Sequence, residues 1–388
     1  MQVAIAAGES SGDALGAGLI TALKAVPGVG SLDFYGIAGP AMRAAGCEAW
    51  HRSEELSVMG LAEVLQHLPR LLRLRRGFGR RLLAGPPDVF VGIDSPDFNL
   101  PLAAKLKRAG ICTIQYVSPQ VWAWRQSRVK SIAEAVDAVL CILPFEADFY
   151  AEHGVEARFV GHPLADEIPL EADRAQARAA LGIAPGVRLL ALLPGSRRSE
   201  VSRLARPFAE TAEWLAGRVG GLEVAVAIAD EGLVAEWSAA TAGVAAASGY
   251  AQFVGRAREV MSAADVVLTA SGTASLEAML LKRPFVVAYK MTPLSYWILR
   301  RMGIQKLPFY SLPNLLAGEA LAAEHVQGDV RPDVLGPALL RSLEADANDA
   351  GRIALMREIH ERLRQGGSDV AARAVLDYVR ARRVRVAV

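Results

Sequence analysis

Residues Val266–Leu281 read VVLTASGTASLEAMLL and decide the fold class. The apolar run that opens the stretch predicts a buried strand, and the spacing of Leu276, Met279 and Leu280 predicts a helix with one apolar face. Small residues join the two. This layout presents the unpaired N–H groups of a helix start to an anion. The stretch therefore predicts an α/β domain that binds a phosphorylated ligand, with Glu277 within reach of a sugar hydroxyl.

Short apolar runs alternate with helical patterns along the whole chain. In the first half these runs are Val3–Ala7, Val89–Ile93, Ile111–Val117, Ala138–Ile142 and Ala157–Val160. In the second half they are Leu189–Leu193, Glu223–Ile228, Gln252–Val254, Val266–Leu268 and Phe285–Val287. Repeated strand–helix units imply a mostly parallel sheet with helices on both faces. We therefore predict two doubly wound, Rossmann-like α/β domains facing a cleft, into which the loops after the strands point.

The segment from Gly161 to Gly186 is rich in proline and acidic residues and separates the two series of strands. It predicts an N-terminal domain over residues 1–165 and a C-terminal domain over residues 166–364. By analogy with related folds, the last helix, at about residues 365–388, is expected to pack back on the first domain. A chain of 388 residues is long enough for two such cores.

The composition bounds the class of protein. Hydrophobic residues make up 52% of the chain, but no run reaches the roughly 18 uncharged apolar residues of a membrane-spanning helix. The start, MQVAIAAGESSGD, has no basic region and indicates a strand rather than a signal peptide. The wide spacing of Cys47, Cys112 and Cys141 argues against a zinc site or disulfides and fits a reducing cytoplasm.

A second candidate phosphate loop lies in LALLPGSRRSEV, at Leu190–Val201. Its glycine allows close approach, its serine can cap the following helix, and its arginine can bind two phosphate oxygens at once. An ordinary turn with a solvated arginine would show the same sequence. Two such loops in one half favour a diphosphate held between them, with no metal or cofactor. The predicted contacts are Gly195, Ser196, Arg197, Ser271, Gly272 and Thr273.

The first half holds the best catalytic candidate. In VFVGIDSPDFNLPLA, Asp94 directly follows an apolar strand and Asp97 comes three residues later. A carboxylate at the end of a buried strand can have its pKa raised and can act as a general base. Both aspartates could instead serve turn and cap roles around Pro96. The sequence leaves open which of the two is the working base.

The loop AGESSGD follows the first strand and carries Glu9, Ser11 and Gly12. These residues could contact a polar ligand or could cap the next helix. The loop lacks the G-x-G-x-x-G pattern, which disfavours a dinucleotide site. The segment SLPNLL places Asn314 before a helix, where a plain helix cap explains it equally well.

From Val58 to Arg81, apolar residues recur at roughly helical spacing, interrupted by Pro69, and six arginines crowd the second part. A basic amphipathic helix can lie on an anionic bilayer. A core-packed helix with a solvated basic face would show the same pattern. Aromatic residues are not interleaved with the arginines, so nucleic acid is disfavoured as a partner. A second apolar, basic stretch at Leu294–Pro308 favours a membrane-surface role.

The order of motifs along the chain resembles that of the lipid-A-disaccharide synthase family. These motifs are AGESSGD, GIAGPAMRAAGCEAW, VMGLAEVL, VGIDSPDFN, YVSPQVWAWRQSRVK, LPFE, VGHPLAD, LLPGSR, ASGTASLEAML and SLPNLLAG. The resemblance covers nearly the whole chain. It implies a GT-B fold glycosyltransferase of Gram-negative bacteria, cytoplasmic and peripheral on the inner face of the inner membrane.

The resemblance also implies a reaction, in which UDP-2,3-diacylglucosamine and 2,3-diacylglucosamine 1-phosphate (lipid X) give the β(1→6)-linked lipid A disaccharide 1-phosphate and UDP, with inversion. Asp94 aligns with the proposed general base of the family. Arg197 and the N–H groups near Gly272–Thr273 would stabilise the leaving diphosphate, and Glu277 would meet the ribose. No cofactor is implied. The oligomeric state stays open, with a homodimer as one candidate.

The resemblance extends the predicted site to further residues. The UDP site would also include Asn314 and Gln327. The residues that face the acceptor and its acyl chains would be Glu9, Ser11, Gly12, Met59, Val64, Leu68 and Leu72. The segment LAAEHVQ departs from relatives, which often carry a more apolar run ending in ELLQ, while Gln327 keeps the position of the last residue.

Two other classes of function remain open. One is another UDP-sugar enzyme with the GT-B fold, such as a UDP-N-acetylglucosamine 2-epimerase or the transferase that builds lipid II. The segments YVSPQVWAWR and VGIDSPDFN disfavour both enzymes. The other is a non-catalytic protein that binds a nucleotide or a lipid. Turnover that depends on Asp94 would exclude this class.

Overall fold

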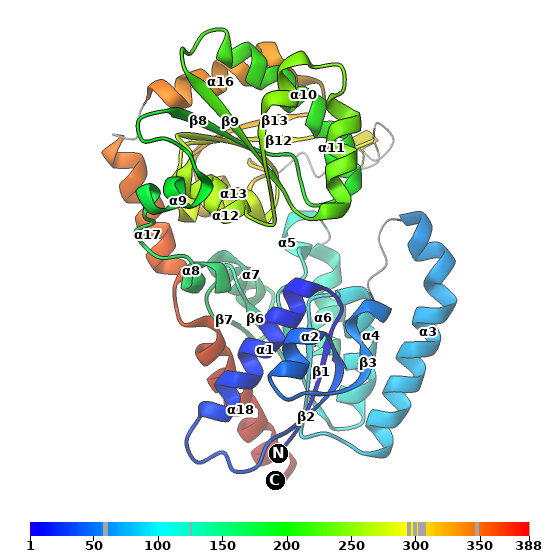
Figure 1. Ribbon diagram of the computed structural model, residues 1–388. Helices are drawn as coiled ribbons and strands as arrows, with labels where there is room; N and C mark the ends of the chain where they lie inside the picture. Colours follow the sequence, from blue (N-terminus) through cyan, green and yellow to red (C-terminus); the bar gives the residue numbers. More distant parts are fainter. Residues whose placement is uncertain are drawn as a thin grey trace. The chain divides into compact units, whose positions relative to one another are not determined.

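The computed structural model describes residues 1–56, 61–124, 126–292, 296–297, 301, 308–345 and 349–387. The chain folds into two compact units (Figure 1). Unit 1 consists of Met1–Asp166 together with Leu363–Val388, and unit 2 consists of Glu167–Arg362. The chain thus enters unit 2 once and returns to unit 1 for its last helix.

Unit 1 is built on a parallel sheet with the strand order β3-β2-β1-β4-β5-β6-β7. The strands are β1 (Gln2–Ala7), β2 (Asp33–Ala38), β3 (Glu48–Arg52), β4 (Val89–Ile93), β5 (Cys112–Tyr116), β6 (Ala138–Cys141) and β7 (Ala157–Phe159). Because β1 pairs with β2 on one side and with β4 on the other, the strand order reverses at β1. All five residues of β4 are buried, as expected for an apolar strand covered on both faces.

Helices cover both faces of this sheet. They are α1 (Ser10–Ala25), α2 (Pro40–Ala44), α3 (Leu61–Ala84), α4 (Pro96–Arg108), α5 (Val121–Trp124), α6 (Val129–Ala135), α7 (Pro144–Glu152), α8 (Pro163–Glu167) and α18 (Gly367–Ala387). Side chains of β1 alternate between two apolar clusters, with Val3 and Ile5 in one and Ala4 and Ala6 in the other. Helix α18 packs against α1 and adds Val375 to the first cluster.

Unit 2 repeats the architecture with the strand order β10-β9-β8-β11-β12-β13. The strands are β8 (Arg188–Leu193), β9 (Leu222–Ile228), β10 (Ala251–Val254), β11 (Val266–Ala270), β12 (Phe285–Tyr289) and β13 (Ala323–Val326). The helices are α9 (Arg174–Leu181), α10 (Arg198–Ala216), α11 (Val234–Thr241), α12 (Ala257–Ala263), α13 (Thr273–Leu280), α15 (Leu312–Ala317), α16 (Pro332–Glu344) and α17 (Ala350–Leu363). Strand β8 pairs with β9 and with β11, so this sheet reverses its order at β8.

The two parallel, doubly wound sheets confirm the predicted fold class. Three strands that the sequence pattern did not indicate are β2, β3 and β13. Strand β2 carries a glycine, Gly36, in its middle, while β3 (EAWHR) and β13 (AEHV) lie at sheet edges and are mostly half-buried. Edge strands keep polar residues on their open side, so they lack the apolar run of a central strand.

Helix α3 continues through Pro69, where the apolar pattern of the sequence is interrupted. A proline inside a helix removes one backbone hydrogen bond, but burial elsewhere in the helix can offset that cost. The C-terminal part of α3 is anchored by Phe78 and Leu82, which are 1% and 0% exposed. Within the described ranges, every helix is too short or too polar to cross a bilayer.

Candidate active site

The two candidate phosphate loops follow the two strands at which the sheet of unit 2 reverses its order. The turn at Pro194–Arg197 follows β8, and the loop at Ser271–Gly272 follows β11, its direct neighbour. Chain segments leave β8 and β11 toward opposite sides of the sheet, which opens a crevice at the carboxyl ends of the strands. Strand order therefore brings together two loops that are about 75 residues apart in the chain.

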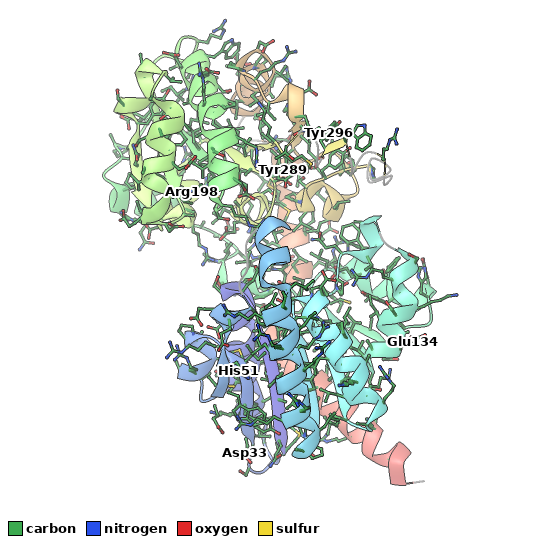
Figure 2. All side chains as sticks on the ribbon, turned by 90° about the vertical axis from the view of Figure 1, so that its right-hand side faces the viewer. Asp33, His51, Glu134, Arg198, Tyr289 and Tyr296 are labelled. Atoms are coloured by element: carbon green, nitrogen blue, oxygen red, sulfur yellow. The ribbon has the colours of Figure 1, made fainter. Side chains whose placement is uncertain are left out.

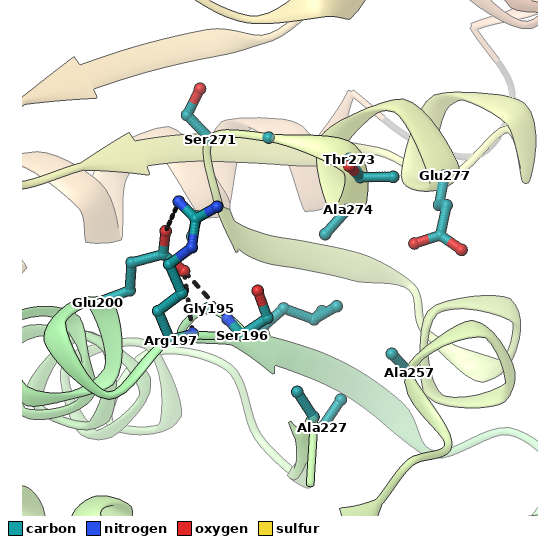
Figure 3. Close-up of a pocket in the computed structure, with 14 residues that line it drawn as sticks. Gly195, Ser196, Arg197, Glu200, Ala227, Ala257, Ser271, Thr273, Ala274 and Glu277 are labelled. Carbon is teal, nitrogen blue, oxygen red and sulfur yellow. Dashed lines mark hydrogen bonds and ion pairs between the residues drawn. The ribbon is translucent and has the colours of Figure 1, made fainter. Parts of the chain in front are cut away.

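A pocket of about 300 Å³ lies in this crevice (Figure 3). Seven of the predicted UDP contacts line it, namely Gly195, Ser196, Arg197, Ser271, Gly272, Thr273 and Glu277. The remaining wall consists of Leu193, Glu200, Ala227, Ala229, Ala257, Ala270 and Ala274. The alanines leave room for a flat or bulky group, while the polar residues gather at the two loops.

The shape of the first loop depends on Gly195 and Glu200. Gly195 has a φ of +121°, and a Cβ atom there would lie 2.5 Å from both Cβ and Oε2 of Glu200. The Glu200 carboxylate accepts hydrogen bonds from the backbone N–H groups of Ser196 (3.0 Å) and Arg197 (3.3 Å). Glu200 was not among the residues predicted for the site. The signal that indicates it is a glutamate in the first turn of the predicted helix, whose carboxylate can reach back to the N–H groups that precede the helix.

Arg197 presents its guanidinium to the pocket. Its side chain is 61% exposed, and Nη1 lies 3.8 Å from Oε1 of Glu200. Since Glu200 already engages the N–H groups of this turn, the guanidinium is the group of the turn best placed to bind an anionic ligand. Figure 3 shows Arg197 reaching from the β8 loop toward Ser271 on the facing loop.

The second loop ends at the start of α13. Gly272 is the N-cap residue with a φ of +146°, and no side chain caps the helix there. Thr273 and Ala274, the first helical residues, line the pocket. The N–H groups of a first helical turn lack partners within the helix and carry partial positive charge, so they favour an anion beside them.

Glu277 lies one turn further along α13. Its side chain is 17% exposed, and Oε1 lies 3.5 Å from Nη2 of Arg258. Burial raises the pKa of the Glu277 carboxyl above its ordinary value, while the charge of Arg258 lowers it. Arg258 also donates a hydrogen bond to Glu167 at 3.1 Å. An anchored carboxylate at the pocket wall can accept hydrogen bonds from a sugar hydroxyl.

Asn314 and Gln327 are not among the residues that line this pocket. Asn314 is buried, and its amide exchanges two hydrogen bonds with the backbone of Ala322 at 2.8 and 2.9 Å. The Gln327 side chain accepts a hydrogen bond from the N–H of Met291 at 2.8 Å. Both side chains thus shape loops of unit 2, and their contact with a ligand stays a prediction.

In unit 1, Asp94 and the AGESSGD loop meet at the carboxyl ends of β4 and β1, the neighbouring strands at which this sheet reverses its order. Ala7, the last residue of β1, pairs with Ile93, the last residue of β4. A Cβ atom on Gly8 would lie 2.6 Å from Oγ of Ser95, so the two loops are in contact. Glu9 and Ser11 are exposed and Gly12 is buried at the start of α1.

Burial raises the pKa of the Asp94 carboxyl above its ordinary value, and a hydrogen bond from the Ser95 backbone opposes that shift. Asp97 differs, because its side chain is 85% exposed and accepts a hydrogen bond from Arg128 at 2.9 Å. A general base must take a proton from an alcohol and later release it. A carboxylate with a raised pKa takes that proton more readily than an ordinary carboxylate does. The environment therefore favours Asp94 as the base.

The predicted lipid-facing residues fall on or before α3. Leu68 is 42% exposed and Leu72 is half-buried. Met59 lies outside the described residues, and Val64 belongs to α3 but its side chain is outside the described part. Among the described residues, no three or more His, Cys, Asp or Glu side chains form a group that could hold a metal ion.

Comparison with known structures identifies the fold. The UDP-GlcNAc 2-epimerase from Neisseria meningitidis, solved with UDP-GlcNAc, covers 97% of this chain and 100% of its own length with a TM-score of 0.63 at 11% identity. The calicheamicin glycosyltransferase CalG4 covers 97% of this chain and 98% of its own length with a TM-score of 0.60 at 16% identity. At these identities the likeness concerns the fold alone, which is that of GT-B enzymes.

Sequence comparison identifies the family. The model of the lipid-A-disaccharide synthetase family matches residues 3–377. The lipid-A-disaccharide synthase of Alkalilimnicola ehrlichii is 51% identical over 379 residues, which are 97% of this chain and 98% of that protein. The enzyme of that name from Yersinia pseudotuberculosis is 48% identical over 377 residues, which are 97% and 95% of the two chains. The chain therefore belongs to the lipid-A-disaccharide synthetase family, the glycosyltransferases of lipid A biosynthesis.

Proposed function

We propose that this chain transfers 2,3-diacylglucosamine from its UDP derivative to the 6-hydroxyl of lipid X, giving the β(1→6) disaccharide 1-phosphate and UDP. The observation that carries the proposal is the pocket of unit 2, where the Arg197 guanidinium, the start of α13 and Glu277 surround a space suited to a nucleotide diphosphate. Family membership supports this donor and acceptor.

The reaction is a single displacement at the anomeric carbon of the donor. The Asp94 carboxylate takes the proton of the acceptor hydroxyl as that oxygen bonds to the anomeric carbon. The bond from this carbon to the β-phosphate oxygen breaks, and its electron pair leaves with UDP. Arg197 and the first-turn N–H groups of α13 stabilise the charge that develops on the diphosphate. One displacement turns an α-linked donor into a β-linked product.

Mass spectrometry of the products tests this function. The purified chain is incubated with UDP-2,3-diacylglucosamine and lipid X, and we expect disaccharide 1-phosphate and UDP in equal amounts. A protein that binds UDP but forms no disaccharide would instead be the non-catalytic binding protein. A parallel incubation with UDP-N-acetylglucosamine alone tests the epimerase alternative, for which the expected product is the 2-epimer.

We further propose that the chain binds the surface of an anionic membrane through α3. The exposed side chains of this helix include Leu68 and four arginines, Arg70, Arg73, Arg76 and Arg80. Phe78 and Leu82, which lie on the side of the helix turned away from Arg73, Arg76 and Arg80, hold it in the core. Helix α3 faces the viewer in Figure 2, where it forms one surface of unit 1. In unit 2, Trp297 is 52% exposed and lies under the guanidinium of Arg301.

Replacement of Arg70, Arg73 and Arg76 by serine is expected to weaken binding to vesicles of phosphatidylglycerol and phosphatidylcholine by about 10²-fold. Each basic residue near an anionic surface contributes about 1 kcal/mol, and about 1.4 kcal/mol is a tenfold change. Vesicle sedimentation measures the change. The matched control replaces Lys105, Arg108 and Lys130, exposed basic residues of α4 and α6, and should bind as wild type. Equal loss in both triple variants would contradict a specific role for α3.

A further inference from the structure

Among the described residues of unit 1, three that are not glycine have positive φ angles, and they lie at the ends of the neighbouring strands β4 and β5. They are Asp94 (+48°), Ser95 (+41°) and Val117 (+70°). The left-handed region is unfavourable for side chains with a Cβ atom, and most of all for a β-branched residue such as valine. Strained backbone persists only where the surrounding contacts hold it, and such strain gathers at functional sites.

The Asn99 side chain supplies one set of these contacts. Asn99 lies in the first turn of α4 and is 0% exposed. Its Nδ2 donates to the carbonyl oxygen of Asp94 at 2.9 Å, and also lies 3.3 and 3.4 Å from the carbonyl oxygens of Ile93 and Ala6. A Cβ atom at position 92 would lie 2.8 Å from Cβ of Asn99, so Gly92 is what lets this amide pack under the loop.

The Gln115 side chain supplies the second set. Gln115 lies on β5 and is 1% exposed. Its Nε2 donates to the same carbonyl oxygen of Asp94 at 3.0 Å, and it lies 3.3 and 3.4 Å from the carbonyl oxygens of Val117 and Tyr116. Two buried amides from different elements thus converge on one carbonyl oxygen and reach two of the three strained residues.

We propose that Asn99 and Gln115 are positioning residues for the glycosyl transfer, because their amides hold the left-handed backbone at Asp94 and so fix where its carboxylate stands. This role rests on the proposed function of Asp94 as the base. Hydrogen bonds to a carbonyl inside a water-poor interior are strong, and a donor lost there leaves the oxygen without a replacement from solvent. Without the amides, the residues at the end of β4 can relax out of the strained conformation.

The test uses Asn99→Leu and Gln115→Met in the full chain, since leucine and methionine approximate the shapes of the two amides but cannot donate. We expect kcat to fall by about 10²-fold, the size of the effect when a reacting group is displaced by about 1 Å. The KM for UDP-diacylglucosamine and the Kd for UDP should stay at wild-type values, because the donor pocket lies in unit 2. The control is Thr113→Val, which removes a buried hydroxyl of β5 that bonds to Ala135 and Asp137.

A double-mutant cycle with Asp94→Asn separates positioning from general damage. In the Asp94→Asn background the amide substitutions should cost no further activity, because the group that they position is already inactive. Losses that multiply, or an equal loss in Thr113→Val, would overturn the positioning role. If Gln115→Met does not fold, Gln115→Asn shortens the amide and takes its place.

The two proposals fail in different ways. Wild-type turnover in Asp94→Asn would refute the proposed base, and with it the positioning role. A large loss in Asp94→Asn together with wild-type kcat in both amide variants would refute the positioning role alone.

Discussion

Replacement of Asp94 by asparagine lowers kcat by about 10²–10⁴-fold, if the carboxylate is the base that takes the proton of the acceptor hydroxyl. The amide keeps the shape of the side chain but cannot accept that proton. The Kd for UDP should not change, because the residues that line the pocket proposed for UDP belong to unit 2. The effect is measured as the rate at which UDP is released from UDP-diacylglucosamine in the presence of lipid X.

The same substitution is expected to leave the midpoint of thermal unfolding unchanged or to raise it. Burial raises the pKa of Asp94 in the folded chain, so the folded chain binds this proton more tightly than the unfolded chain does. The free energy of unfolding therefore falls as pH rises between the unfolded and the folded pKa values. Asparagine has no charge to bury and escapes that cost at neutral pH. A lower midpoint with lost activity would indicate a structural role instead.

The raised pKa also sets the sign of the pH dependence. Only the ionised carboxylate can act as the base, so kcat/KM should fall on acidification, with a midpoint above the ordinary aspartate pKa of about 3.9. Asp97→Asn is the matched control, since Asp97 is 85% exposed and pairs with Arg128. The Asp97→Asn variant should keep near-wild-type turnover, and its kcat/KM should fall on acidification with the same midpoint as that of the wild type. A large loss in Asp97→Asn but not in Asp94→Asn would reverse the assignment of the base.

Replacement of Arg197 by alanine is expected to lower kcat/KM for the UDP donor between about 10- and 150-fold. A hydrogen bond to a charged group contributes about 1.5–3 kcal/mol, and this guanidinium belongs to a residue that lines the pocket of unit 2. The Kd for UDP, measured by calorimetry, should rise together with the KM. The Kd and kcat/KM of Arg197→Lys should lie between those of the wild type and of Arg197→Ala, because lysine keeps the charge but lacks the planar fork that binds two oxygens.

The neighbouring Arg198 provides the control for the loss of charge. Its side chain is 75% exposed, lies 3.7 Å from Glu236, and is absent from the residues that line the pocket. Arg198→Ala should therefore bind UDP as the wild type does. Equal weakening in both variants would show a general effect of surface charge, which added salt would abolish. Unchanged UDP binding in Arg197→Ala would place the diphosphate elsewhere.

Much of the architecture follows from local sequence. The central strands other than β2 were predictable because they are apolar on both faces, whereas Gly36 interrupts the apolar run of β2. The loops after β8 and β11 were predictable because small and polar residues end those strands abruptly. The edge strands β3 and β13 were not, since their polar residues resemble loops. Helix α3 runs through Pro69, because the local cost of this proline is outweighed by the packing of residues further along the helix.

The buried side chains that hold the loops of the site in place could not be predicted in the same way. Asn99, Gln115 and Glu200 act through hydrogen bonds to backbone atoms, and the residue type alone does not say which atoms it reaches. Asn99 appeared only as part of a motif, and Gln115 as one polar residue in an apolar strand. Their common target, the carbonyl of Asp94, is 5 and 21 residues away in the chain.

The sequence by itself determined the parallel α/β class, the positions of the two candidate phosphate loops and the family, because apolar periodicity and short motifs are properties of contiguous residues. The tertiary structure decided what these pieces do together. Pairing of β8 with β11 joins two distant loops into one pocket, and pairing of β1 with β4 sets the AGESSGD loop beside Asp94. The strain at Asp94 and the amides that hold it exist only once the strands are in register, since backbone carbonyls separated in sequence meet side-chain donors only through the sheet.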